Sequence, residues 1–492
     1  MRRETETVPT MRAGVACARL RGLVSCLVSH VSCRVSEGAA VAAYLVALAV
    51  VLARMAAVKA YWFDELFTLH LSRFDSVREL LANLAAGADL NPPLNYLLTH
   101  LAVSLFGESP IAVRSPAIFG ALLAHGSLYA FLRHRRPAAE AWLGMLALGL
   151  TPAAWYYFVE ARPYGLMLGL AGFALLAWQR RWAVPFALAL MLGVLSHYYF
   201  VLPLAALAAA EVVRKPSRGM LVGFALAALV LLACLPLMAA GAEYKPGFWA
   251  KTKLSLTTIA DAYQKLTTGE VVPPVLFAVF VAFLPGKRVE GRIVPTAEVV
   301  ALILLALGPA FGVVIGAKLT GAYFHRYSLP ATLGLAGLFA LALGRIGPRW
   351  LWLAVPVVAY FGPLGHWRTG PGYFANDARE LAALADFLSA NATGRVACDS
   401  AFDAVRLHHH HGGRNFQPVF RANPAEAMRH THTDTLDRGL LALRRVAPLP
   451  VCDEPPAYFL GPYTSWRAAY TGFTLVPVAE CPGGKLWELV KE

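Results

Sequence analysis

The chain has 492 residues, of which 58% are hydrophobic and only 15% charged, and its formal net charge is +14. This composition excludes an ordinary soluble protein and indicates a polytopic membrane protein. The basic residues fall in short clusters between apolar runs, as in cytoplasmic loops, so we expect no nucleic-acid partner.

Residues 1–38 carry several arginines and no apolar run long enough to span a membrane. No small-residue cleavage site follows an apolar core, so we expect an uncleaved cytoplasmic tail, with Met11 as an alternative start. The seven cysteines include no C-x-x-C pair, which argues against a zinc or redox motif. One disulfide among Cys398, Cys452 and Cys481 stays open if that region is extracytoplasmic.

Residues 39–364 are expected to form a membrane domain, because spanning helices need roughly 17–25 apolar residues and such runs recur through this region. We predict about eleven spans. Their expected bounds are 39–58, 112–132, 138–157, 163–178, 183–197, 199–213, 220–241, 271–285, 294–316, 328–344 and 349–364. Basic clusters such as Arg133–Arg136 then fall on one side, which the positive-inside rule makes cytoplasmic.

The first extracytoplasmic loop, 59–111, is long and patterned. Ser76 and Glu79 form a capping-box signature, and apolar residues then recur at helical spacing, which predicts an amphipathic helix at the membrane surface over 76–86. The apolar run "LNYLLTHLAVSLFG", 94–107, is short for a span, so we interpret it as a juxtamembrane or re-entrant helix. Counting it as a span leaves 12 or 13 spans as alternatives.

Residues 365–492 regain polar and charged side chains. A helix is expected over 376–391 and strands over 394–399, 456–461 and 486–491, which predicts a small extracytoplasmic α/β domain. The four histidines at 408–411 are interpreted as a solvated loop rather than a metal site.

Polar residues at the outer ends of spans are the candidates for function, because ionisable groups near a membrane are costly to keep there. Asp64 and Glu65 lie in "YWFDELFTLH", 61–70, just after the first span. The remaining candidates come from four later segments and are Asn91, Glu160, Arg162, His197, Tyr198, Lys318, His325 and Arg326. Cations on the outer face run against the positive-inside trend, and a phosphate ligand would explain them.

Taken together, "WFDE" (62–65), "NPPL" (91–94), "EARPY" (160–164), "HYYF" (197–200) and "HRYSLP" (325–330) give a recognisable series. In order and sidedness these motifs resemble the GT-C membrane glycosyltransferases, and most closely family 39, the bacterial protein mannosyltransferase and aminoarabinose transferase type. The resemblance covers about 40–345. Family members often have His where this chain has Asn91.

The resemblance implies a cell-envelope glycosyltransferase of the bacterial inner membrane, with an inverting transfer from a sugar on polyprenyl phosphate. Asp64 would be the catalytic carboxylate with Glu65 beside it. Arg162, Arg326 and Lys318 would contact the donor phosphate. The other substrate contacts would be Asn91, Glu160, Tyr164, His197, Tyr198, His325 and Tyr327.

The chemistry fits these residue types without the family. Transfer to a hydroxyl needs a base, which a positioned carboxylate supplies, and the phosphate leaving group needs fixed cations. A divalent metal can share that task but is not required. Arabinose, mannose, glucose and aminoarabinose stay open as the sugar, and a lipid, a glycan or a protein as the acceptor.

Two other classes are weighed against this enzyme. A transporter or lipid flippase would place ionisable residues in the middle of spans and show inverted repeats, whereas the candidates here lie at the outer ends. A non-catalytic membrane scaffold with a C-terminal binding module predicts that Asp64→Asn leaves function intact.

Overall fold

The computed structural model describes residues 36–248, 251–267, 294–346, 348–445, 447–452, 454–481 and 484–492. The predicted tail up to residue 35 and the predicted span 271–285 lie outside these residues. The chain divides into two compact units, and the second is Val51–Glu492. The boundary falls within the helix Ser36–Val58. The fold below is that of the second unit.

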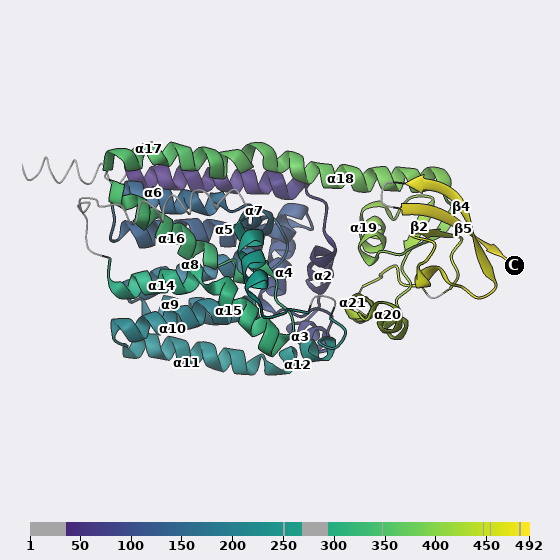
Figure 1. Ribbon diagram of the computed structural model, residues 1–492, viewed down its shortest axis with the longest axis horizontal. Coiled ribbons are helices and arrows are strands. Elements are labelled where there is room, and N and C mark those ends of the chain that lie inside the picture. Colours follow the sequence, from purple (N-terminus) through teal and green to yellow (C-terminus); the bar gives the residue numbers. More distant parts are fainter. Residues whose placement is uncertain are drawn as a thin grey trace, which may run out of the picture. The chain divides into compact units, whose positions relative to one another are not determined.

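The membrane part of this unit is helical, and its long helices lie side by side in Figure 1. Its helices are α2 (Phe63–Leu71), α3 (Val77–Ala85), α4 (Leu94–Phe106), α5 (Pro110–Arg133), α6 (Ala138–Ala147), α7 (Pro152–Phe158), α8 (Tyr164–Arg180), α9 (Ala183–Ser196), α10 (Val201–Arg214), α11 (Arg218–Ala233), α12 (Leu235–Tyr244), α14 (Thr296–Ala306), α15 (Gly308–Ile315), α16 (Ala331–Leu343) and α17 (Pro348–Ala359).

Helices α5 and α8 pack so closely that only glycine fits at their contact. A Cβ atom on Gly120 would lie 2.2 Å from the carbonyl oxygen of Gly165, and one on Gly169 would lie 2.4 Å from that of Gly120. Small residues allow such close approach of membrane helices. This packing fixes the start of α8 against the middle of α5.

The number of spans stays a prediction. Among the described residues, Ser36–Val58 and Pro110–Arg133 are long and apolar enough to cross a membrane. The number rises to four if α11 with α12, bent by 48°, and α14 with the segment Gly308–Thr320, bent by 51°, each count as one span. Other predicted runs are divided into shorter helices, as where Pro152 starts a new helix inside the run 138–157. The run 94–107 forms the 13-residue helix α4.

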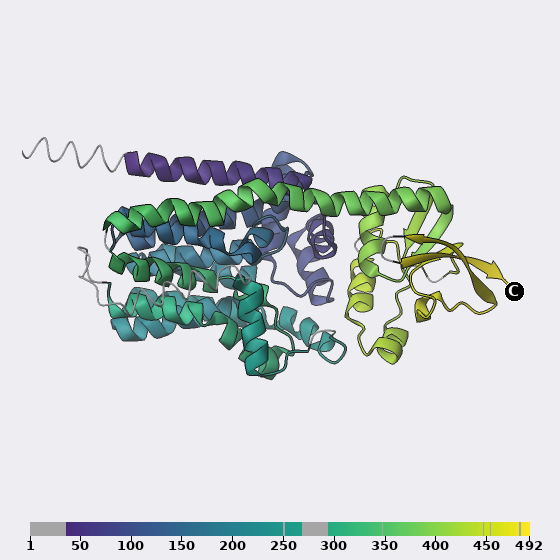
Figure 2. The same cartoon turned by 45° about the horizontal axis from the view of Figure 1, so that its top comes forward.

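The C-terminal region contains the expected α/β arrangement. Helix α18 (Gly365–Asn391) follows α17 in line in Figures 1 and 2 and leads into a five-stranded sheet. The strand order is β2-β1-β3-β5-β4, with β1 parallel to β2 and β3 and with antiparallel pairs β3–β5 and β4–β5. The elements are β1 (Gly394–Cys398), α19 (Ala401–His411), β2 (Phe416–Val419), α20 (Pro424–Thr431), α21 (Thr435–Leu443), β3 (Tyr458–Leu460), β4 (Phe473–Cys481) and β5 (Gly484–Lys491).

Two features of this region differ from the sequence-based interpretation. The four histidines are not a loop but the last turn of α19, a helix whose N-cap, Ser400, accepts a hydrogen bond from the Asp403 amide. Cys398, Cys452 and Cys481 are free thiols, so no disulfide forms among them.

The segment 59–111 and the C-terminal region share one hydrophobic core. Phe63, Leu66 and Phe67 of α2 belong to the same buried cluster as Val405 of α19 and Leu440 of α21. Burial of apolar area is the main stabilising contribution here. The segment that carries Asp64 is therefore held between the helical bundle and the C-terminal region.

Candidate active site

A cavity of about 590 Å³ lies where the segment 59–111, the helix ends and the C-terminal region meet. Eight of the twelve predicted site residues line it: Asp64, Asn91, Arg162, Tyr164, His197, Tyr198, Arg326 and Tyr327. The other four, Glu65, Glu160, Lys318 and His325, are not among its lining residues. Segments more than 260 residues apart in the sequence, such as those of Asp64 and Tyr327, thus converge at one place.

Asp64 lies in the first turn of α2, where the helix dipole favours a negative charge. Its side chain is 31% exposed, and its Oδ2 lies 4.0 Å from a terminal nitrogen of Arg326. The two charges face each other without a close hydrogen bond. This leaves a carboxylate and a guanidinium available to a ligand between them.

Arg326 is fixed by aromatic residues. It lies in the 3₁₀ turn His325–Ser328, and its Nε donates a hydrogen bond of 3.0 Å to the hydroxyl of Tyr164. Its guanidinium lies 4.3 Å from the centre of the Phe324 ring. Burial opposes its charge, but Tyr164, Tyr327 and Asp64 together raise the pKa of Arg326 further above its usual range. Arg326 therefore stays a cation in the cavity.

Arg162 is already paired. Its guanidinium donates hydrogen bonds to both carboxylate oxygens of Asp89, and a terminal nitrogen donates one of 3.2 Å to the backbone carbonyl of Asp64. Both side chains are less than a tenth exposed. Burial opposes ionisation of Asp89, but Arg162 holds the pKa of Asp89 below its usual range. Asp89 was missed in the sequence, although it opens the segment "DLNPPL".

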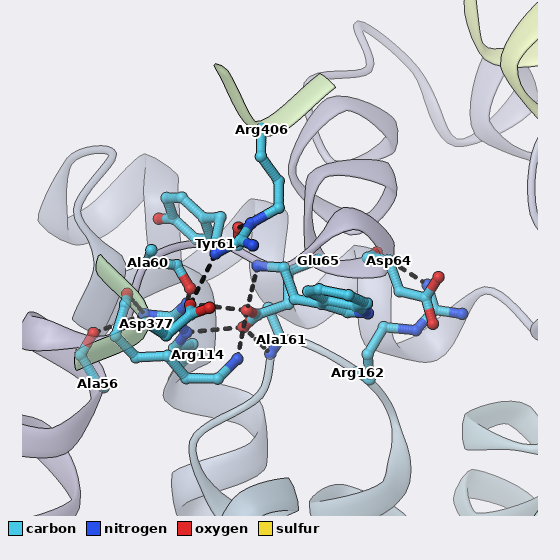
Figure 3. A network of polar contacts seen from close by, with 12 residues as sticks. Ala56, Ala60, Tyr61, Asp64, Glu65, Arg114, Ala161, Arg162, Asp377 and Arg406 are labelled. Atoms are coloured by element: carbon cyan, nitrogen blue, oxygen red, sulfur yellow. Dashed lines mark hydrogen bonds and ion pairs between the residues drawn. The ribbon is translucent and has the colours of Figure 1, made fainter. Parts of the chain in front are cut away.

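Glu65 belongs to a buried polar cluster (Figure 3), and it is not among the residues that line the cavity. Its carboxylate accepts hydrogen bonds of 2.5 Å from Lys59, of 2.7 and 2.9 Å from Arg114, of 2.9 Å from the Trp62 amide and of 2.7 Å from the Ala161 amide. Burial opposes its charge, but Arg114 and Lys59 hold the pKa of Glu65 far below its usual range. Glu65 joins the start of α2 to the turn that carries Arg162.

The remaining predicted residues lie outside the cavity. Lys318 is exposed on the turn Gly316–Thr320, whereas Lys245, at the end of α12, lines the cavity and donates a hydrogen bond of 3.1 Å to the Leu319 carbonyl. His325 lies 3.4 Å from the Tyr157 hydroxyl. Glu160 is buried, and burial raises its pKa to about 7.

An aromatic wall completes the cavity. The ring centre of Tyr327 lies 4.9 Å from that of His197 and 4.8 Å from that of Tyr199. His197 caps the turn after α9, because its Nδ1 accepts a hydrogen bond of 3.1 Å from the Tyr199 amide. Such packed rings give the cavity a rigid, amphipathic surface. The part of the chain that the structure describes contains no group of three or more His, Cys, Asp or Glu residues that could hold a metal.

Comparison with known proteins identifies the fold. Neither a protein-family model nor a curated protein matches the chain. ArnT from Cupriavidus metallidurans in the apo state matches with a TM-score of 0.59 and 15% identity, over 91% of this chain and 97% of ArnT. ArnT bound to undecaprenyl phosphate matches over the same shares with a TM-score of 0.57 and 15% identity.

The archaeal oligosaccharyltransferase AglB from Archaeoglobus fulgidus also matches, with a TM-score of 0.39 and 12% identity over 85% of this chain and 69% of AglB. The ArnT comparison shows that the chain has the ArnT fold. At the level of fold, the resemblance to GT-C membrane glycosyltransferases that the motifs predicted is confirmed.

Proposed function

We propose that the chain is an integral membrane glycosyltransferase of the bacterial inner membrane. It transfers a sugar from a polyprenyl-phosphate donor to an acceptor hydroxyl on the extracytoplasmic face. The observation that carries the proposal is the Asp64 carboxylate facing Arg326 at 4.0 Å in a large, aromatic-lined cavity. The ArnT fold, and undecaprenyl phosphate bound by ArnT itself, support a lipid-linked donor.

In the proposed reaction Asp64 accepts the proton of the acceptor hydroxyl as that oxygen attacks the anomeric carbon. The bond from the anomeric carbon to the phosphate oxygen breaks, and its electron pair leaves with the polyprenyl phosphate. Attack from the face opposite the phosphate inverts the anomeric centre. The leaving phosphate gains negative charge during this step, so cations placed beside it lower the barrier.

Arg326 and Lys245 are the cations that we assign to the phosphate. Both line the cavity, and neither forms a close ion pair with a carboxylate there. Arg162 is neutralised by Asp89, so we assign it to holding the Asp64 backbone rather than to a direct phosphate contact. The sequence-based prediction gave the phosphate contact to Lys318, which does not line the cavity. We assign that contact to Lys245 instead.

A membrane-based transfer assay tests the proposal, with radiolabelled polyprenyl-phosphate sugars supplied to wild type and to Asp64→Asn. We expect one donor to be used, and turnover in Asp64→Asn to fall by roughly 10²–10⁴-fold because the base is lost. Donor binding should persist, because Arg326 and Lys245 remain. Wild-type turnover in Asp64→Asn, or retention at the anomeric carbon, would contradict the mechanism.

A further inference from the structure

The segment immediately before Asp64 is bound by a helix of the C-terminal region. The Tyr61 amide donates a hydrogen bond of 3.0 Å to Nε2 of His410, and the Tyr61 carbonyl accepts one of 3.2 Å from Nε of Arg406. Both partners belong to α19, some 345 residues away in the chain. Both polar groups of the Tyr61 backbone are therefore satisfied by the C-terminal region.

The contact follows the helical repeat of α19. Phe402, Arg406 and His410 are spaced four residues apart and so lie on one face of the helix. Phe402 stacks on Trp62 with ring centres 5.3 Å apart and planes 16° apart, and it meets Phe63 edge-on at 4.8 Å. The guanidinium of Arg406 lies over the Trp62 ring at 5.3 Å. Three successive turns of α19 thus contact the three residues before Asp64.

The contact between α19 and Tyr61 is buried, and a residue of α18 holds Arg406 in place. Tyr61 is 6% exposed and Arg406 is 7% exposed. A terminal nitrogen of Arg406 donates a hydrogen bond of 2.7 Å to Asp377 of α18, which fixes the orientation of the guanidinium (Figure 3). Well-packed buried groups of this kind hold a single geometry.

The same segment is held from the bundle side. Arg114 of α5 donates a hydrogen bond of 3.2 Å to the Ala60 carbonyl, and its guanidinium lies 4.7 Å from the centre of the Tyr61 ring. The Trp62 amide is bound by Glu65. Residues 60–62 are therefore clamped between α5 and α19, and α2 begins at the next residue.

His410 has the protonation state that this contact needs. Burial, with His409, Arg406 and His411 around it, lowers the pKa of His410 to about 4. At neutral pH His410 is therefore a neutral imidazole, in which one ring nitrogen carries a proton and the other can accept a hydrogen bond. The hydrogen bond that the Tyr61 amide donates to Nε2 assigns the proton to Nδ1.

We propose that α19 is the positioning element of the active site, with Arg406 and His410 as positioning residues that hold Asp64 toward the cavity through Tyr61 and Trp62. The inference rests on the proposed function, in which Asp64 is the base. It makes the C-terminal region part of the catalytic unit rather than an accessory that only selects the acceptor.

The test uses the full-length protein and three variants. His410→Phe keeps an aromatic ring but removes the hydrogen-bond acceptor, His410→Gln keeps an acceptor, and His411→Phe changes the neighbouring histidine, which lies near Arg414 and Asp386 instead. We expect His410→Phe to lower kcat by about tenfold to a hundredfold with the donor KM unchanged, because a small misplacement of a catalytic group costs this much. His410→Gln and His411→Phe should stay within about threefold of wild type.

Hydrogen exchange provides a second readout that does not depend on turnover. The Tyr61 amide should exchange faster in His410→Phe than in wild type or His410→Gln, while the amides of β1 keep their protection. Unchanged exchange at Tyr61, or wild-type kcat in His410→Phe, would overturn the inference. Loss of turnover in Asp64→Asn with normal kcat in His410→Phe would refute this inference and leave the proposed function standing. Turnover in Asp64→Asn would refute the function itself.

Discussion

Asp64 and Glu65 are neighbours in the chain, but the structure gives them different surroundings. Successive residues of a helix point about 100° apart, so one carboxylate lies at the cavity and the other in the buried cluster with Arg114. The two lysines differ in position and not in burial, because both are exposed but Lys245 lines the cavity and Lys318 does not. At the scale of single residues, burial and partners distinguish groups of the same chemical type.

Lys245 and Lys318 provide a matched pair of substitutions. We expect Lys245→Ala to raise the donor KM by about tenfold, since one charge-assisted contact to a phosphate is lost. Lys318→Ala should leave the donor KM within about twofold, because its side chain does not line the cavity. Steady-state kinetics with the donor identified above measures both. Equal effects of the two substitutions would refute the assignment of Lys245.

The raised pKa of Glu160 predicts that the stability of the protein depends on pH. Its pKa in the fold is about 7, above the ordinary value of 4.5, because burial disfavours the carboxylate. The unfolded chain loses this proton at lower pH than the folded chain does, so the contribution of Glu160 to stability falls as pH rises from about 4.5 to about 7. The stability gained by Glu160→Gln should grow over this interval and level off above it.

Melting temperatures of wild type and Glu160→Gln in detergent, taken from pH 5 to pH 8, test this expectation. Glu426→Gln is a suitable control because the Glu426 side chain is 30% exposed, whereas that of Glu160 is buried, and it pairs with Arg421 at 3.4 Å. A constant difference between Glu160→Gln and wild type across the range would contradict the raised pKa.

At the scale of elements, α5 joins the bundle to the segment 59–111. Arg114 lies near the start of α5 and donates hydrogen bonds to the carbonyls of Ala56, Lys59 and Ala60 as well as to Glu65. It therefore caps the end of the first helix and fixes the start of α2 at once. The glycine contact between α5 and α8 then places Arg162 beside the same cluster.

Arg114→Ala should destabilise the protein strongly. It leaves the buried Glu65 carboxylate with less compensation, and breaking a buried ion pair in this way costs roughly 3–5 kcal/mol. Arg73→Ala is the matched control, because its pair with Glu108 is about 40% exposed and worth at most about 1 kcal/mol. Thermal unfolding of both variants in detergent gives the comparison. Similar unfolding temperatures for the two variants would show that the cluster is not structural.

At the scale of the whole molecule, the cavity depends on parts far apart in the sequence. Thr435, Leu436 and Gly439 of α21 line it from the C-terminal region, opposite residues of the bundle such as Tyr164 and Tyr327. The cavity therefore has its full wall only when the C-terminal region is folded onto the segment 59–111. This arrangement suits a domain that takes part in acceptor binding.

Gly439 offers a test of that wall. A Cβ atom there would lie 3.6 Å from Phe67, an ordinary contact, so Gly439→Ala should keep turnover near that of wild type. Gly439→Leu places a larger side chain between Phe67 and the cavity and should lower acceptor-dependent transfer by about tenfold or more. Hydrolysis of the donor by water, measured in the same membranes, should fall less. An equal loss of transfer and of donor hydrolysis would show that Gly439→Leu impairs donor binding and not acceptor binding.

Much of the architecture could be predicted from local pattern. The helices over 76–86 and 94–107 and the strands near 394–399, 456–461 and 486–491 are present within a few residues. The helix expected over 376–391 ends where predicted, but it begins earlier, at Gly365. Their periodicity and end signals are local properties of the chain, so no tertiary information was needed. The span count could not be tested in this way, because helix breaks at residues such as Pro152 divide the apolar runs.

The sequence by itself determined the membrane class, the small C-terminal α/β region and the set of polar segments that reach the cavity. Apolar run length, charge placement and motif order are all present in the linear chain. Only the tertiary structure decided that Glu65 is buried and Asp64 is not, that Asp89 pairs with Arg162, and that Arg406 and His410 reach back to Tyr61. These contacts join residues far apart in sequence, and which side chains meet depends on how helices and loops pack in three dimensions.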